Sequence, residues 1–511
     1  MVKVHGSAYF GVGATTITVE VNLGQGINFI LVGLPDNAVK ESQKRIVAAF
    51  KNSGFEYPRH EITVNMAPAD IRKEGSAYDL TIAIAILAGS GQIRCESLDE
   101  YVIMGELSLD GSIQPMKGVL PIAIQSVKEG FKKILLPAAN AREAAIVKGL
   151  DVYGVESIQD AVGVLNGDSH IKPIKVDIDS ELANCQGNSE FDFADVKGQE
   201  NIKRAMEVAA AGGHNLIMIG PPGAGKTMLA RRLPSILPPM NLEEALETTK
   251  IHSVAGKLPK HKSLVPVRPF RSPHHTISDV ALVGGGAFPQ PGEISLAHHG
   301  VLFLDELPEF KRAVLEVMRQ PLEERKVTIS RARFSIEYPA SFMLVASMNP
   351  CPCGFYNHPE KECVCPTGTV SKYLNRISGP LLDRIDLHVE VTPVPFRELS
   401  EKRTNIDSAT IRERVVRARR RQAERLKDAE GIHCNAQLSP RQIAAFCDRG
   451  EDSMRLLKQA MERLGLSARA YERILKVSRT IADLDGSDAI RSHHVAEAIQ
   501  YRSLDREGWA G

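Results

Sequence analysis

The stretch that decides the fold is Gly220-Pro221-Pro222-Gly223-Ala224-Gly225-Lys226-Thr227. A short apolar run at 216–219 precedes it, and a run typical of a helix, opening with Met228, follows it. Strand, glycine loop and helix in this order predict a phosphate-binding P-loop, because the glycines let backbone N–H groups turn inward on a phosphate. We therefore expect this stretch, with Met228, to bind ATP. Lys226 would face the β- and γ-phosphates, and the Thr227 hydroxyl would face Mg²⁺.

Two later apolar runs end on polar side chains. The run at 301–304 ends on Asp305 and Glu306, and a buried parallel strand would deliver both carboxylates to the carboxyl edge of the sheet, beside the P-loop. We expect Asp305 to hold Mg²⁺ through its water shell and Glu306 to polarise the attacking water. The run at 342–348 ends on Asn349, whose amide would reach the γ-phosphate; the alternative is a turn-forming asparagine.

An arginine stands at a predicted helix end just before the strand at 387–391. This is Arg384, in the segment 381–386 (LLDRID). From the far edge of the core it would reach the γ-phosphate of a neighbouring subunit rather than its own, and such a finger raises phosphoryl-transfer rates by about 10³–10⁵ in related systems. The alternative is an ion pair with Asp383 or Asp386. The finger interpretation predicts hydrolysis sites between subunits.

Composition narrows the class of protein. The chain has 511 residues, a net charge of +1 and 24% charged residues, so any nucleic-acid surface is a local patch. The longest apolar run, 80–88, is too short to span a bilayer, and the N-terminus lacks the apolar core of a signal peptide. We expect a cytoplasmic protein without a membrane partner.

Two basic segments are candidates for contacts with DNA. The segment 325–334 alternates like a hairpin, and Lys326, Arg331 and Arg333 would contact phosphates, unless this is only a solvated edge strand. The predicted helix at 410–427 has an apolar stripe and an excess of arginine, which suits an exposed face, DNA or a neighbouring subunit. Its arginines are Arg412, Arg414, Arg417, Arg419, Arg420, Arg421 and Arg425.

Four of the eight cysteines lie close together in the chain. Cys351 and Cys353 form one C-x-C pair, and Cys363 and Cys365 form a second. Four thiolates suit tetrahedral Zn²⁺, although C-x₂-C pairs are more common. The alternatives are reduced, partly buried thiols and a role for His358 as a ligand. A zinc-closed loop after Asn349 would stiffen the backbone that positions that amide.

The pattern of strands and helices predicts a multidomain α/β protein. Residues 1–168 alternate strand and helix signals, with strands at 15–21 and 27–32 and a buried helix at 80–87. Polar residues accumulate over 169–193, which indicates a linker. Residues 194–396 form the expected nucleotide core with a parallel sheet, and 397–511 form the expected helical lid, with an amphipathic helix starting near Arg469.

Taken together, these segments resemble an AAA+ ATPase, and several resemble its magnesium-chelatase-related branch. The latter are 271–276 (RSPHHT), 284–286 (GGG) and 291–298 (PGEISLAH); with 349–354 (NPCPCG) they resemble the YifB/ComM competence family over essentially the whole chain. The resemblance implies a homo-oligomeric ring, expected to be a hexamer, that hydrolyses ATP. It also implies that hydrolysis drives branch migration or unwinding of single-stranded or branched DNA in recombination and natural transformation. It also implies that Asn349 is sensor 1 and that Arg469 is sensor 2, contacting the nucleotide from the lid.

The front of the chain resembles the ribosomal S5-type proteolytic domain of Lon proteases, on the segments 72–80 (RKEGSAYDL) and 105–111 (GELSLDG). That resemblance implies a Ser–Lys dyad, but the nucleophile position holds Ala77, or Tyr78 if the gap is shifted. The lysine region holds Leu120 and Ile122. A displaced pair of Ser76 and Lys117 is the alternative. We expect a retained scaffold without protease chemistry. A magnesium-chelatase motor acting on a porphyrin and an ATP-dependent protease remain the competing functions.

Overall fold

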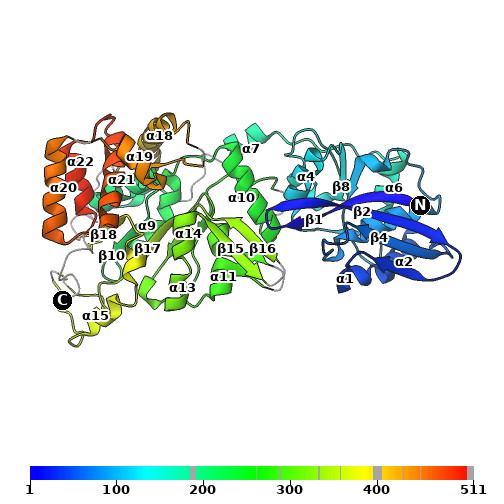
Figure 1. The fold of residues 1–511 in the computed structure, drawn as a ribbon, viewed down its shortest axis with the longest axis horizontal. Helices are drawn as coiled ribbons and strands as arrows, with labels where there is room; N and C mark the ends of the chain where they lie inside the picture. The colour runs from blue at the N-terminus through cyan, green and yellow to red at the C-terminus, as the bar shows by residue number, and fades with distance from the viewer. Residues whose placement is uncertain are drawn as a thin grey trace.

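The computed structural model shows an elongated molecule with a sheet-rich domain at one end, an α/β core in the middle and a helical region at the other end (Figure 1). The structure describes residues 1–184, 191–259, 262–286, 289–331, 334–356, 358, 360–394, 405–429, 431–448 and 450–502. None of the helices in these ranges is long and apolar enough to cross a membrane.

The N-terminal domain is built on a seven-stranded mixed sheet of order β3-β4-β2-β1-β5-β8-β9. Its strands are β1 (Val2–Phe10), β2 (Gly13–Gly24), β3 (Phe29–Val32), β4 (Glu61–Ala67), β5 (Tyr101–Ile103), β8 (Lys133–Pro137) and β9 (Asp151–Val155), with a small separate pair β6 (Glu106–Leu107) and β7 (Ile113–Gln114). The helices are α1 (Asn37–Lys40), α2 (Ser42–Ser53), α3 (Asp79–Gly89), α4 (Val119–Lys128), α5 (Ala138–Ala144) and α6 (Ile158–Asn166). The strands expected at 15–21 and 27–32 and the buried helix at 80–87 are confirmed as β2, β3 and α3.

The core holds a five-stranded sheet of order β11-β14-β17-β10-β18, in which every pair is parallel. Its strands are β11 (Phe270–Arg271), β14 (Val301–Leu304), β17 (Met343–Met348), β10 (Leu216–Ile219) and β18 (Leu387–Glu390). β10, β14 and β17 are buried along their whole length, which is why they read as continuous apolar runs rather than alternating ones. The predicted multidomain α/β fold with a parallel sheet is confirmed.

Helices and two hairpins surround this sheet. The helices are α8 (Glu200–Gly212), α9 (Lys226–Arg232), α10 (Leu242–Ala255), α11 (Asp279–Val283), α12 (Glu293–Leu296), α13 (Arg312–Glu316), α14 (Arg319–Glu324), α15 (Thr369–Leu374) and α16 (Gly379–Leu382). The hairpins are β12 (Gly284–Gly285) with β13 (Gln290–Pro291), and β15 (Lys326–Arg331) with β16 (Phe334–Pro339). The second pair confirms the hairpin expected from the alternation at 325–334.

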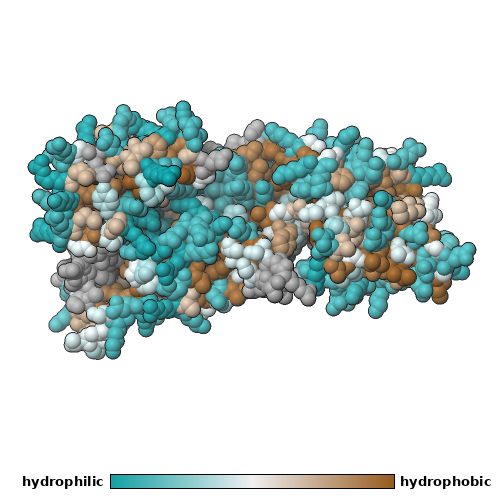
Figure 2. Space-filling model, in the orientation of Figure 1, coloured by the Kyte–Doolittle hydropathy of each residue, from teal (hydrophilic) through white to brown (hydrophobic). Residues whose placement is uncertain are grey.

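The C-terminal region is helical and shares one apolar core with the nucleotide domain. Its helices are α18 (Ser408–Arg425), α19 (Pro440–Phe446), α20 (Glu451–Leu464), α21 (Ala468–Leu484) and α22 (Ser492–Gln500). Apolar side chains of α18 and α21 belong to the same buried cluster as those of α8 and β10. Hydrophilic residues dominate the outer surface of this region on the face shown in Figure 2, as expected when the apolar stripes face inward.

The N-terminal domain docks on the core through α4 and α10. Leu120 and Ile146 of the N-terminal domain form one buried cluster with Met240 and Ala245 of the core. The stretch predicted to be a linker joins this cluster, because Ile178 of the short helix α7 (Ile178–Asn184) is buried in it. The linker is therefore not a structureless spacer: it is part of the interface.

Candidate nucleotide site

The P-loop connects the carboxyl end of β10 to the start of α9. Gly223 and Gly225 have φ angles of 78° and 88°, in the left-handed region that glycine tolerates best. Gly220 is fixed by contact instead: a Cβ there would lie 2.3 Å from the carbonyl oxygen of Val391 in the neighbouring chain segment. Local sequence and close packing together hold the loop in its turn.

Lys226, the first residue of α9, is almost completely buried beside this loop. Its Nζ donates to the carbonyl oxygens of Gly220 (2.7 Å) and Pro221 (2.9 Å) and to Oδ1 of Asn349 (3.1 Å). Desolvation lowers the pKa of the Lys226 ammonium group, while Asp305 and Glu306 act in the opposite direction. In the described part of the chain only neutral oxygens bond to Nζ, so the charge is suited to phosphate oxygens.

Thr227 and Asp305 are joined directly. The Thr227 hydroxyl donates to Oδ2 of Asp305 at 2.7 Å. The Ser347 hydroxyl donates to the other carboxylate oxygen of Asp305, which holds the carboxylate from both sides. Hydroxyl and carboxylate oxygens are the ligands that Mg²⁺ prefers, so this pair fits the metal that accompanies ATP.

Glu306 follows Asp305 in a left-handed conformation, with φ at 55°. Its exposed carboxylate lies 3.7 Å from Nδ1 of His275. Neither His275 nor Ser347 was predicted as a site residue. Ser347 could be noticed in the sequence because it lies in the strand that ends at Asn349. Its contact with Asp305 could not be predicted, because it depends on β14 lying next to β17 in the sheet.

The structure brings Lys226, Thr227, Asp305 and Asn349 together at the carboxyl edge of the sheet, with Glu306 beside them. This follows from the strand order, since β17 lies between β14 and β10. Parallel strands end at the same edge, so the polar residues that follow them converge.

Arg384 and Arg469 lie elsewhere in the single chain. The Arg384 guanidinium is 7% exposed; it pairs with Glu323 at 2.5 Å and donates to the Pro380 carbonyl oxygen. Arg469 is 61% exposed and lies 3.5 Å from Asp383. Within the described residues, no hydrogen bond or ion pair joins either arginine to the P-loop.

The four clustered cysteines converge. Their sulfur atoms all lie within 4.8 Å of one another, with Cys351–Cys353, Cys351–Cys363 and Cys353–Cys363 separations of 3.3, 3.7 and 3.6 Å. The loop they form packs against the P-loop, because a Cβ on Gly354 would lie 2.4 Å from Cδ of Pro222.

The basic candidates have different surroundings. Lys326 lies at the base of the β15–β16 hairpin and pairs with Glu337 at 2.8 Å. Arg331 ends β15, but its side chain, like the whole of Arg333, lies outside what the structure describes. On α18, Arg414 pairs with Glu207, Arg421 with Asp488 and Arg425 with Asp483. These three therefore serve contacts within the chain.

The displaced Ser76–Lys117 pair lacks the burial that a lysine base requires. Lys117 is exposed, and its aliphatic chain lies over Gly256 at the end of α10, across the domain interface. The side chain contributes to docking of the domains.

Comparisons with known proteins place this site in a family. Family models described as subunit ChlI of magnesium chelatase match residues 19–140 and 192–399, and one described as the ChlI C-terminal region matches 405–502. The competence protein ComM of Haemophilus influenzae is 45% identical over 507 residues, covering 98% of this chain and 97% of that protein. The chain belongs to the YifB/ComM family of magnesium-chelatase-like proteins.

A second relative also matches the full chain, and a third matches part of it. The YifB protein of Escherichia coli K12 is also 45% identical over 507 residues, with the same coverage of 98% and 97%. Lon protease 2 of Bacillus subtilis is 33% identical over 159 residues, which are 28% of this chain and 27% of that protein. Membership in the magnesium-chelatase-like family implies an ATPase that uses ATP and Mg²⁺.

Proposed function

We propose that this chain is the ATP-hydrolysing subunit of a ring, expected to be a hexamer, that moves branched DNA. The observation that carries the ATPase part is the cluster in which Lys226 meets Asn349 and Thr227 meets Asp305. The DNA part rests on the likeness to a competence protein over the full chain and on the basic hairpin.

Each residue of the site has a role in this proposal. Bound ATP supplies the phosphoryl group, and Mg²⁺ supplies positive charge that offsets the developing charge on its oxygens. The P-loop amides and Lys226 hold the phosphates, while Thr227 and Asp305 hold the metal ion. Glu306 orients and polarises water, and Asn349 fixes the position of the Lys226 ammonium group. Arg384 of a neighbouring subunit, and Arg469 from the helical region, would complete the site.

The DNA-coupled activity is tested by the ATPase rate of the full-length protein with and without single-stranded and four-way-junction DNA. We expect both DNAs to stimulate hydrolysis and ATP to drive strand exchange on the junction. The matched control is Glu306→Gln, which keeps the P-loop and should bind ATP but drive no exchange. Hydrolysis by assembled rings with no response to either DNA would contradict the motor.

A magnesium-chelatase motor is the second candidate, favoured by the family models that match most of the chain. Such a motor would be stimulated by a porphyrin-binding partner rather than by DNA, so the same ATPase assay separates the two.

We also propose that Cys351, Cys353, Cys363 and Cys365 hold Zn²⁺. A Zn–S distance of about 2.3 Å in a tetrahedron puts the sulfur atoms about 3.8 Å apart, close to the separations seen here. Metal analysis of purified protein should give one zinc per chain, and Cys363→Ser should lose it. Cys95→Ser, which changes a cysteine outside the cluster, is the control and should retain it. Protein purified without chelators and free of zinc would contradict the assignment.

A further inference from the structure

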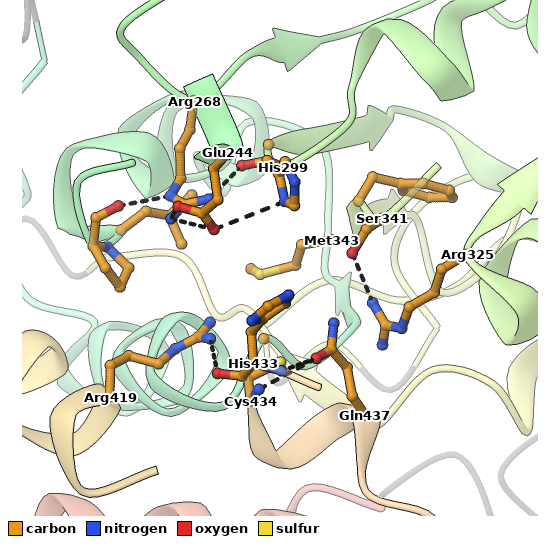
Figure 3. A pocket seen from close by; sticks show the side chains of 15 residues that line it. Glu244, Arg268, His299, Arg325, Ser341, Met343, Arg419, His433, Cys434 and Gln437 are labelled. Carbon is orange, nitrogen blue, oxygen red and sulfur yellow. Dashed lines mark hydrogen bonds and ion pairs between the residues drawn. The ribbon is translucent and has the colours of Figure 1, made fainter. Parts of the chain in front are cut away.

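A polar cavity lies at the edge of the core sheet opposite the P-loop, where the core meets the helical region (Figure 3). Gly300, just before β14, and Met343, at the start of β17, line it from the core, and Arg419 and His433 line it from the helical region. The P-loop follows the carboxyl end of β10, which runs parallel to β17 in the same sheet. Four residues at about 3.3 Å each put roughly 13 Å of strand between the two edges, so this is a separate site.

Three arginines line the cavity, and one of them is fully engaged. The Nη2 of Arg268 donates to both carboxylate oxygens of Glu244 (2.9 and 3.1 Å), and its Nε and Nη1 donate to the carbonyl oxygens of Pro238 (2.6 Å) and His299 (2.8 Å). Glu244 also accepts from the backbone N–H of Asn241, at the start of α10. The charge of Arg268 is therefore already neutralised by Glu244, and this ion pair forms one wall of the cavity.

The other two guanidinium groups, of Arg325 and Arg419, have no carboxylate within ion-pair distance among the described residues. Arg325 donates to the Ser341 hydroxyl at 3.3 Å, and Arg419 donates to the carbonyl oxygens of Ala210 (3.1 Å) and His433 (3.4 Å). The Nε of Arg419 is buried without a hydrogen-bond partner. Both side chains point toward the middle of the cavity from opposite walls in Figure 3.

The surroundings do not balance this charge. Burial lowers the pKa of Arg325, and the charge of Arg419 lowers it further, although Cys434 and Asp386 act in the opposite direction. The Asp386 carboxylate already has other partners: it pairs with Arg473 at 2.9 Å and accepts a hydrogen bond from the backbone N–H of Asn215. Two guanidinium groups kept partly out of water without a counter-charge are costly, and an anion between them would remove that cost.

The size and donors of the cavity define the anion. Its volume is about 70 Å³, several times the 10–15 Å³ that one ordered water needs, which leaves room for a small oxyanion. The planar forks of two arginines match a tetrahedral oxyanion, which they can bind through paired N–H groups. Gln437 accepts backbone N–H groups of His433 and Cys434 through its carbonyl oxygen, which leaves its amide N–H groups as further donors.

We propose that this cavity binds a small tetrahedral oxyanion, inorganic phosphate, clasped between Arg325 of the core and Arg419 of the helical region. Arg325 directly precedes β15, and its carbonyl oxygen accepts from Ala340 just after β16. Phosphate bound here ties the base of the β15–β16 hairpin to α18. Since phosphate is released by ATP hydrolysis, the site would let the product stabilise the contact between hairpin and helical region.

The test is a calorimetric titration of inorganic phosphate into the full-length protein with the P-loop saturated by Mg²⁺-ADP. We expect one phosphate per chain, bound at least tenfold more weakly by Arg325→Ala and by Arg419→Ala, because each removes a charged hydrogen-bonding fork. Arg325→Lys and Arg419→Lys keep the charge and the packing and should weaken binding less. Arg421→Ala is the matched control on α18, because Arg421 pairs with Asp488 outside the cavity. The Arg421→Ala protein should bind phosphate with the affinity of the wild type.

The proposal is overturned by any of these results: no binding at tens of millimolar phosphate, equal affinity in all arginine variants, or binding that is lost in Lys226→Ala but kept in Arg325→Ala. Competition by a short DNA strand that depends on Arg325 would also overturn it, because the ligand would then be a backbone phosphate of DNA. The measurement needs neither hydrolysis nor DNA movement, so its outcome is independent of the proposed motor function.

Discussion

A carboxylate that holds a metal ion must itself be held, and Ser347 does this for Asp305. The serine is fully buried, and its hydroxyl donates to one carboxylate oxygen while Thr227 donates to the other. The same hydroxyl lies 3.4 Å from the backbone nitrogen of Glu306, so it also orients the start of the next residue. One side chain on β17 thereby positions both acids that follow β14.

Ser347→Ala should therefore lower kcat/KM for Mg²⁺-ATP by about 10- to 100-fold, since a hydrogen bond to a charged group contributes about 1.5–3 kcal/mol. The fold should survive, because the change removes one oxygen from a packed site. The measurement is the ATPase rate over a range of Mg²⁺ concentrations. Ser295→Ala is the control: its hydroxyl is buried with no hydrogen-bond partner among the described residues, and the rate should not change. Equal rates in the two variants would show that Ser347 does not position Asp305.

His298 makes the core sensitive to acid. Burial lowers its pKa from 6.5 to about 4, although Glu247 acts in the opposite direction. The geometry agrees, because Nδ1 accepts from the backbone N–H of Ser341 at 3.0 Å and a proton on Nδ1 would break that bond. The unfolded chain therefore binds more protons than the folded chain between pH 4 and 6.5, and stability falls as the pH falls through this window.

His298→Gln, which cannot titrate, should reduce this loss of stability between pH 7 and pH 4 by about 3 kcal/mol, the equivalent of a shift of about 2.5 pH units. Urea unfolding of the core, followed by hydrogen exchange of the β14 and β17 amides, measures the difference. His493→Gln changes an exposed histidine and should keep the pH dependence of the wild type. The assignment fails if both variants follow the wild-type curve.

At the scale of elements, the loop that contains the four cysteines packs directly against the P-loop. Gly354 has a φ angle of 87°, and its backbone lies against the ring of Pro222. A change at Gly354 would therefore press directly on Pro222 of the P-loop. The arrangement gives a structural reason for a cysteine cluster directly after Asn349.

Gly354→Ala should raise the KM for ATP by at least fivefold, because the new Cβ would displace Pro222. Gly368→Ala separates this effect from backbone strain: Gly368 has a similar φ of 76°, but a Cβ there would meet nothing within 4 Å. Both variants should lose about 1–2 kcal/mol of stability from the left-handed backbone, and only Gly354→Ala should weaken nucleotide binding. Nucleotide titrations and thermal unfolding of the two proteins give the comparison, and equal KM values would exclude the coupling.

The same scale shows how far sequence reasoning reached. The P-loop was predictable because strand, glycines and helix are consecutive, and the convergence of Asp305 and Asn349 followed from parallel strands that end at one edge. The partners of Ser347, His275 and Gly354 were not predictable, because each lies on another segment whose position depends on strand order and loop packing. The arginines of α18 illustrate the same limit. Composition indicated a basic face, but several of these arginines form ion pairs with residues far away in the sequence, such as Glu207 and Asp483.

At the scale of the whole molecule, apolar packing joins each domain to the next. One apolar cluster runs from the core into the helical region, and another joins α4 of the N-terminal domain to α10 and α7. Movement of the helical region would therefore be felt by the core sheet, and movement of the core by the N-terminal domain. This continuity suits a subunit that transmits the effect of a nucleotide to a neighbour in a ring.

Ring function makes its sharpest prediction through Arg384, which Glu323 and the Pro380 carbonyl hold within the single chain. If assembly presents this arginine to the P-loop of the next subunit, Lys226→Ala and Arg384→Ala rings should each be inactive, although Arg384→Ala should still bind ATP. An equal mixture of the two should regain roughly a quarter of wild-type turnover, because about one interface in four pairs an intact P-loop with an intact arginine. Lys226→Ala mixed with the double variant Lys226→Ala/Arg384→Ala contains no such interface and should stay inactive. Steady-state ATPase assays on mixtures whose subunit exchange has been verified decide the matter: an inactive first mixture, or full turnover by Arg384→Ala alone, would show that each chain hydrolyses ATP without its neighbour.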